Sequence, residues 1–132
     1  MGRISLFIIF FWFGLLKLLS LSPAEGLVRR LHEITLSHLI TSDHFLVLLG
    51  IVECGIGILW LFPKLTKLAF IVFIAQMCAT FLPLLFLTGD TWTNSMVLTL
   101  TGQYIVKNLA LVALAAILLF SAKQSKNGFY SL

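Results

Sequence analysis

Charged residues are scarce in this 132-residue chain, and that scarcity limits what the protein can be. Asp, Glu, Lys and Arg make up 11% of the sequence and hydrophobic residues 60%. An ordinary soluble globule, in which about a quarter of the residues are charged, is therefore excluded. The nine basic residues are scattered between apolar segments, so the net charge of +4 does not indicate nucleic-acid binding. The composition predicts a protein whose solvent is lipid.

Cysteine is also rare. Cys54 and Cys78 both lie inside apolar runs, which excludes an extracellular disulfide framework. The two thiols are predicted at nearly equal depth on neighbouring helices, so a redox pair is one interpretation. The other is that both are small apolar residues, because a C-x-x-C motif is missing and a thiolate is disfavoured in lipid.

Catalytic and metal-binding motifs are missing as well. The sequence contains no phosphate loop, no nucleophile elbow and no HExxH zinc motif. His32, His38 and His44 are evenly spaced, but on one helix six-residue steps turn each side chain about 120° from the last. No metal site is predicted, and only a break in that helix would bring two of these histidines together.

Long apolar segments are what the chain does have. About 20 apolar residues cross a bilayer, and four segments reach or approach that length. They are residues 4–22, 45–62, 66–88 and 103–121. The predicted fold is all-α, an integral membrane four-helix bundle in which residues 1–132 form a single transmembrane domain.

The connections between these segments differ in character. Residues 24–44 place leucines and an isoleucine at near-helical spacing beside charged residues, which predicts an interfacial amphipathic helix between helices 1 and 2. Pro83 predicts a kink late in the third span. Segment 88–102 has no clear period, so its structure stays open. Trp60 and Trp92 are expected in interfacial aromatic belts.

Orientation follows from the basic residues near the ends of the spans. One side holds five of them and the other only Arg29 and Arg30, which predicts that both termini are cytoplasmic. The five are Arg3, Lys64, Lys67, Lys123 and Lys126. Glu25 and Glu33 flank the two outer arginines and are expected to pair with them.

Three of the apolar runs carry one ionisable residue each: Lys17, Glu53 and Lys107. A charge near the centre of a membrane helix costs about 2.5–3.5 kcal/mol on insertion scales. Counted at the rise of a helix, Lys17 and Lys107 lie roughly 6–7 Å and Glu53 about 12 Å below the outer boundary. We therefore expect a common site, to which Gln76 and Asn108 add polar contacts.

Three interpretations of this cluster remain open. The residues form a buried structural ion pair, or Lys17 and Lys107 simply extend to the outer headgroups, or the cluster is a ligand site. Two lysines and one glutamate leave a net charge of +1, which an anionic or polar ligand such as a quinone head group would balance.

Four stretches of the sequence resemble the DoxX-like family of small bacterial membrane proteins. The resemblance is greatest to the branch that contains the reactive-chlorine-resistance inner-membrane protein. The stretches are FFWFGLLKLL (10–19), GIVECGIGILWLFP (50–63), TFLPLLFLTGDTW (80–92) and GQYIVKNLALVA (102–113). The family motifs G-x-x-K, G-[IV]-V-E and G-x-x-x-[IV]-K-[DN] fall on Gly14 and Lys17, on Gly50, Val52 and Glu53, and on Gly102, Val106, Lys107 and Asn108. Asn108 takes a position where the chlorine-resistance relatives carry an acid.

The resemblance implies a four-helix bundle in the bacterial inner membrane that is linked to redox chemistry or oxidative stress. Some members of the family are subunits of a thiosulfate:quinone oxidoreductase. We therefore expect a protein that binds a quinone- or lipid-like molecule, contacts membrane lipids, and associates with a redox partner subunit or with copies of itself. The alternatives are a structural or assembly subunit and a small-molecule transporter that acts as an oligomer.

Overall fold

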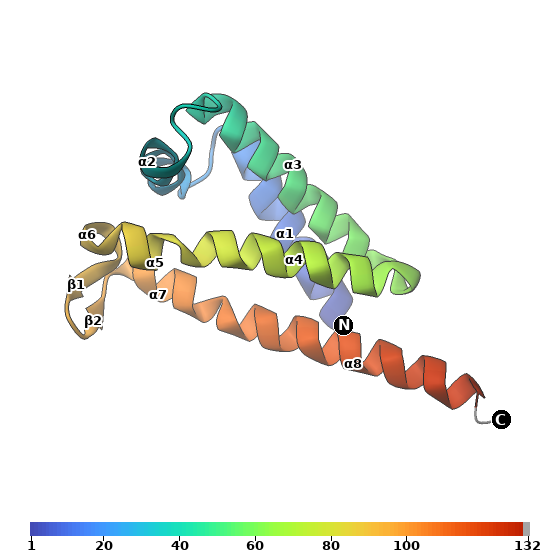
Figure 1. Cartoon of the computed structure of the whole chain (residues 1–132). Coiled ribbons are helices and arrows are strands. Elements are labelled where there is room, and N and C mark those ends of the chain that lie inside the picture. Colours follow the sequence, from blue (N-terminus) through green and yellow to red (C-terminus); the bar gives the residue numbers. More distant parts are fainter. Residues whose placement is uncertain (131–132) are drawn as a thin grey trace.

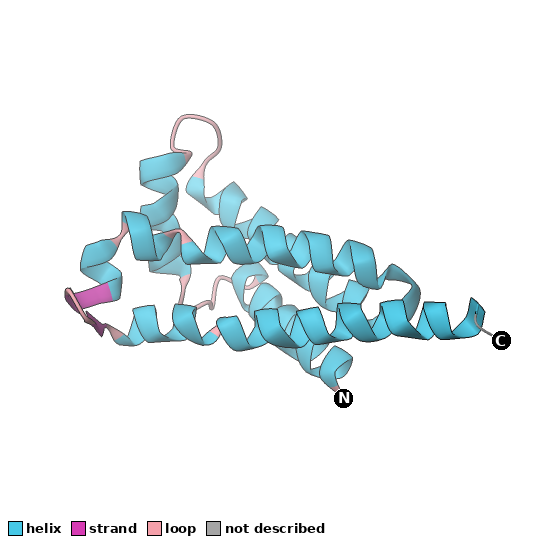
Figure 2. Cartoon of the chain, turned by 60° about the horizontal axis from the view of Figure 1, so that its bottom comes forward, coloured by secondary structure: helices cyan, strands magenta, loops and turns pink. Residues whose placement is uncertain are grey.

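The computed structural model describes the backbone of residues 1–130 and the side chains of residues 1–126. The predicted all-α class is confirmed (Figure 1). The helices are α1 (Gly2–Leu18), α2 (Glu25–Thr35), α3 (Ser42–Leu61), α4 (Thr66–Phe81), α5 (Pro83–Phe86), α6 (Thr88–Thr91), α7 (Leu100–Lys107) and α8 (Leu109–Tyr130), with a 3₁₀ turn η1 (Pro63–Leu65). In the segment whose structure the sequence left open, β1 (Trp92–Asn94) pairs with β2 (Val97–Leu98) in a small antiparallel hairpin (Figure 2).

The long helices pack as two pairs. α1 lies against α3 along most of its length, and α4 lies beside α8 (Figures 1 and 2). Contacts between α3 and α4, which the turn η1 joins, connect one pair to the other. The N-terminus and the α3–α4 turn lie at one end of the structure, whereas α2 and the hairpin lie at the opposite end. The short connection η1 thus places α3 and α4 side by side.

Three stretches are long and apolar enough to cross a membrane: Ser42–Leu61, Pro63–Phe86 and Leu100–Lys126. They correspond to the second, third and fourth predicted spans. The first differs from its prediction, because α1 ends at Leu18 and Ser20 takes the left-handed conformation with φ 55°. The 17 residues of α1 are about 25 Å long at the rise of a helix, somewhat less than the roughly 30 Å of a hydrocarbon core.

Two of the long helical stretches are interrupted. The helical pattern breaks at Leu82, directly before Pro83, whose ring has no N–H to donate. The fourth span was predicted as one helix over residues 103–121, but a turn at Asn108 separates α7 from α8. The N–H of Asn108 donates to Ile105 three residues earlier, which tightens the last turn of α7.

The core lies between the two helix pairs, towards the end of the molecule that holds the N-terminus. Phe73 of α4 contacts Phe10 and Trp60 edge to face, with ring centroids 5.4 and 6.0 Å apart. Trp60 is fully buried, so its prediction as a residue of an interfacial belt was wrong. The other core members are Leu6, Ile56, Ala69, Met77 and Ala115.

Candidate functional site

Close packing of α1 on α3 positions the first candidate site. A Cβ added to Gly14 would lie 2.7 Å from the backbone nitrogen of Cys54 and from the carbonyl oxygen of Gly50. A Cβ at Gly50 would in turn lie 2.9 Å from the carbonyl oxygen of Gly14. Only glycine allows backbones to approach this closely. Lys17 and Glu53 lie three residues beyond these glycines on the same helix faces, so they meet across the contact.

The structure brings Lys17, Glu53 and Gln76 together, and we call them the Lys17–Glu53–Gln76 network. Lys17 Nζ donates to Glu53 Oε2 at 2.6 Å, and Gln76 Nε2 donates to Glu53 Oε1 at 3.1 Å. The three residues come from α1, α3 and α4, and all are buried. Both carboxylate oxygens therefore have partners, which offsets the unfavourable burial of the charge.

Lys107 does not join this network. Its side chain is exposed, and its Nζ lies 5.4 Å from the ring centroid of Tyr104 on its own helix. Within the described part of the chain it forms no ion pair. The prediction that Lys107 shares a site with Lys17 and Glu53 was therefore wrong. The buried pair is neutral, so no excess charge of +1 is left for a ligand to balance.

Asn108 also stands apart from the network. It is half-buried at the turn between α7 and α8, where its carbonyl oxygen accepts N–H groups of Leu111 and Val112. In the described region, its side chain makes no hydrogen bond. The structure thus gives Asn108 a place in the backbone turn, and its predicted ligand contact stays a prediction.

The two cysteines are free and have different surroundings. Cys54 is half-buried, and its Sγ donates to the carbonyl oxygen of Phe11 on α1 at 3.6 Å. Cys78 is exposed on α4. No disulfide joins them, and their use as a redox pair stays a prediction.

The Lys17–Glu53–Gln76 network retains unused hydrogen-bonding capacity. A lysine ammonium has three N–H donors, and Lys17 uses one of them on another side chain. Gln76 Oε1 accepts no hydrogen bond from the described residues. Because the side chains of Lys17 and Glu53 are 7% and 11% exposed, a ligand would reach the network only at its edge. There it would find a donor from Lys17 and an acceptor from Gln76.

A second group of charges surrounds α2 at the opposite end from the N-terminus. Arg29 Nη2 lies 2.7 Å from Glu25 Oε1 and 2.6 Å from Asp43 Oδ1, while Arg30 pairs with Asp90 at 3.0 Å. The hydrogen bonds that Arg29 donates, first to Glu25 and then to Asp43, raise the pKa of Arg29 above its usual value. The predicted pairing of Glu25 with an arginine is confirmed, whereas that of Glu33 was wrong, because Glu33 forms no ion pair within the described residues. The Arg30–Asp90 pair, which joins distant parts of the chain, had no signal in the sequence.

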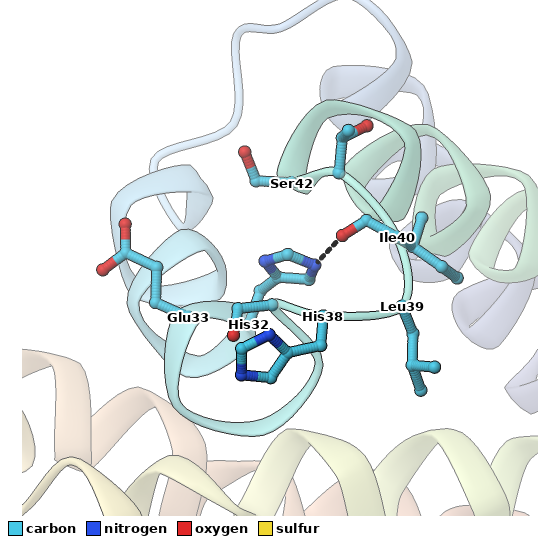
Figure 3. A pocket seen from close by; sticks show the side chains of 8 residues that line it. His32, Glu33, His38, Leu39, Ile40 and Ser42 are labelled. Atoms are coloured by element: carbon cyan, nitrogen blue, oxygen red, sulfur yellow. Dashed lines mark hydrogen bonds between the residues drawn. The ribbon is translucent and has the colours of Figure 1, made fainter.

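The connection between α2 and α3 contains a pocket of about 370 Å³ (Figure 3). His32 lines it and is 3% exposed, with its ring 5.4 Å from that of Phe45. Its Nε2 donates to the carbonyl oxygen of Ile40 at 2.7 Å, whereas its buried Nδ1 has no partner among the described residues. α2 ends at Thr35, so the chain turns and His38 reaches the same pocket. The helix predicted over residues 24–44 was thus too long. The turn after Thr35 brings His32 and His38 to the same pocket.

Neither histidine belongs to a metal site by geometry. In the described residues, no group of three or more His, Cys, Asp or Glu side chains is arranged to hold an ion. The pocket had no signal in the sequence, because the end of α2 at Thr35 is not marked by the periodicity of residues 24–44.

Comparison with family models, curated proteins and solved structures finds no match for this chain. The resemblance to the DoxX-like family therefore depends only on the motifs quoted above.

Proposed function

We propose that this chain is a small multi-pass protein of the bacterial inner membrane that binds the polar head of a quinone- or lipid-like molecule. The head would contact the edge of the Lys17–Glu53–Gln76 network, and the apolar remainder would lie along the surrounding helices. In this proposal the protein is a DoxX-like accessory subunit associated with redox chemistry or oxidative stress.

The observation that carries the proposal is a buried ion pair with spare donor and acceptor groups. A charged pair inside an apolar helix assembly is energetically unfavourable unless its hydrogen-bonding groups are satisfied. Among the described residues, Lys17 Nζ donates a hydrogen bond to one side chain, that of Glu53, although it has three N–H groups. Gln76 Oε1 accepts no hydrogen bond from these residues. The carbonyl oxygen of a quinone would accept a hydrogen bond from Lys17. The hydroxyl of a quinol would donate a hydrogen bond to Gln76.

The distribution of cations supports an orientation with both termini cytoplasmic. Arg3, Lys64 and Lys67 lie near the end that holds the N-terminus and the α3–α4 turn, and α8 runs back towards the same end (Figure 1). Basic residues concentrate on the cytoplasmic side of membrane proteins. The Lys17–Glu53–Gln76 network would then lie nearer the outer side.

A redox role would require a partner. The sequence has no recognisable cofactor motif, so electron transfer would depend on another subunit, which the DoxX-like resemblance suggests for some members.

A specific observation also favours a structural role as the second candidate. Both oxygens of the Glu53 carboxylate already accept hydrogen bonds, so the network is able to hold α1, α3 and α4 together without a ligand. In that case the chain would act as a structural or assembly subunit.

Native mass spectrometry in mild detergent separates the two candidates. The wild type, Lys17→Met and Lys107→Met are compared, since both variants remove one lysine charge but only Lys17 belongs to the network. A quinone or lipid retained by the wild type and by Lys107→Met, but lost from folded Lys17→Met, supports the ligand site. Absence of any bound molecule, together with a stable protein partner, supports the structural role.

A further inference from the structure

We propose that the pocket between α2 and α3 binds a primary ammonium group, supplied by an aminophospholipid headgroup or by a small soluble amine. This site is separate from the Lys17–Glu53–Gln76 network and does not depend on the function proposed for it. The argument starts from His32 and Glu33, two neighbouring residues that line the pocket.

His32 offers the pocket a hydrogen-bond acceptor. Because a carbonyl oxygen can only accept, the bond to Ile40 identifies Nε2 as the nitrogen that carries the proton. In the neutral ring Nδ1 then holds a lone pair, and it is buried without a partner. Buried polar atoms in proteins nearly always have a partner, so this one points to a donor that the described residues do not supply.

Glu33 adds a negative charge without a counter-charge. The chain has five acidic residues, and Glu25, Asp43, Glu53 and Asp90 each form an ion pair. Glu33 forms none within the described part of the chain, and residues 127–132 contain no basic side chain that could complement it. The carboxylate of Glu33 is therefore available to a cation from outside the chain.

The pocket is unsuited to an anion. Arg29 is occupied by Glu25 and Asp43, and Arg30 by Asp90, so the nearby guanidinium groups are already neutralised. Neither arginine lines the pocket. The pocket thus combines a lone pair, a carboxylate and the hydroxyl of Ser37, three acceptors that match the three N–H donors of a primary ammonium.

Access to His32 depends on side chains that are free to move. In Figure 3 the His38 ring lies beside the His32 ring, whereas the Glu33 side chain extends away from it, and both side chains are exposed. Neither side chain makes a hydrogen bond within the region that the structure describes. His38 is therefore able to turn aside and Glu33 to turn towards a ligand, and a volume of about 370 Å³ is sufficient for an ethanolamine-sized group.

The test compares lipids that differ only in the methylation of their ammonium group. The full chain, labelled with ¹⁵N-histidine, is placed in nanodiscs of phosphatidylcholine with or without phosphatidylethanolamine. Phosphatidylethanolamine is expected to shift the Nδ1 resonance of His32, since Nδ1 then accepts a hydrogen bond. The quaternary ammonium of phosphatidylcholine has no N–H and is expected to leave the resonance unchanged. Titration with free ethanolamine in pure phosphatidylcholine shows whether a soluble amine is sufficient.

Two matched variants test the charge. Glu33→Gln is expected to weaken ammonium binding roughly tenfold, because a hydrogen bond to a charged group is lost. Glu33→Asp keeps the negative charge at the same position, and it should retain the binding that Glu33→Gln loses. The proposal is overturned if neither phosphatidylethanolamine nor ethanolamine shifts Nδ1, if phosphatidylcholine acts equally, or if Glu33→Gln binds as tightly as the wild type.

Discussion

The carbonyl oxygen of Gly50 lies 2.7 Å from the position that a Cβ at Gly14 would occupy, so α1 and α3 meet backbone to backbone. This contact has a functional consequence. It sets the separation of the helix axes at the level where Lys17 and Glu53 form their ion pair. Small residues at helix contacts play the same part in membrane proteins generally.

Replacing Gly50 by alanine should therefore destabilise the protein. The added methyl group would lie 2.9 Å from the carbonyl oxygen of Gly14, which is backbone and cannot turn aside. We expect a loss of about 1–3 kcal/mol in the free energy of unfolding, the range typical of overpacked cores. Reversible unfolding in mixed micelles measures the change.

Gly55→Ala is the matched control on the same helix. A Cβ at Gly55 meets nothing within 4 Å, so alanine should be neutral or should stabilise α3 by up to about 1 kcal/mol through its higher helix propensity. Equal effects of the two substitutions would show that the close contact with Gly14 does not exist.

The Lys17–Glu53 pair should behave as a coupled unit. Lys17→Met leaves the carboxylate of Glu53 buried without its cation, and breaking such a pair costs about 3–5 kcal/mol. The double variant Lys17→Met/Glu53→Gln removes both charges and should recover much of that stability. A double-mutant cycle of unfolding free energies measures the coupling, and simple additivity of the two substitutions would contradict the ion pair.

Lys107→Met should have little effect on stability. The lysine is exposed and its Nζ lies over the ring of Tyr104 on its own helix, so the free energy of unfolding should change by no more than about 0.5 kcal/mol. The same unfolding assay is used. A loss comparable with that of Lys17→Met would restore Lys107 to the buried cluster that the sequence predicted.

The sequence could predict the contact of Lys17 with Glu53 but not the position of Lys107. Gly14 and Gly50 allow α1 and α3 to approach closely, and Lys17 meets Glu53 there, which confirms that part of the expected common site. Counting residues from a boundary gives depth only. It does not say on which side of the assembly a helix lies, and α7 packs on α4 and α6, away from α1 and α3.

The pocket near His32 shows a second limit. The periodicity of residues 24–44 correctly predicted a helix in this segment. It did not predict that the helix ends at Thr35. The histidine spacing excluded a shared site only for an unbroken helix. Ion pairs between distant segments, such as Arg30 with Asp90, are set by tertiary packing and leave no periodic signal.

Arg29 should anchor α2 more strongly than Arg30 does. Its guanidinium contacts Glu25 in the same helix and both Ser42 and Asp43 at the start of α3, a set of bonds that needs several N–H groups in a planar fork. Arg29→Lys keeps the charge but loses the fork, so amide exchange across α2 should become faster, and only modestly so because the ion pairs are exposed. Arg30→Lys is the matched control, because Arg30 has one exposed ion pair, with Asp90, and should change exchange little. Hydrogen–deuterium exchange in micelles measures both variants, and equal protection of α2 in the two would contradict this anchoring role of Arg29.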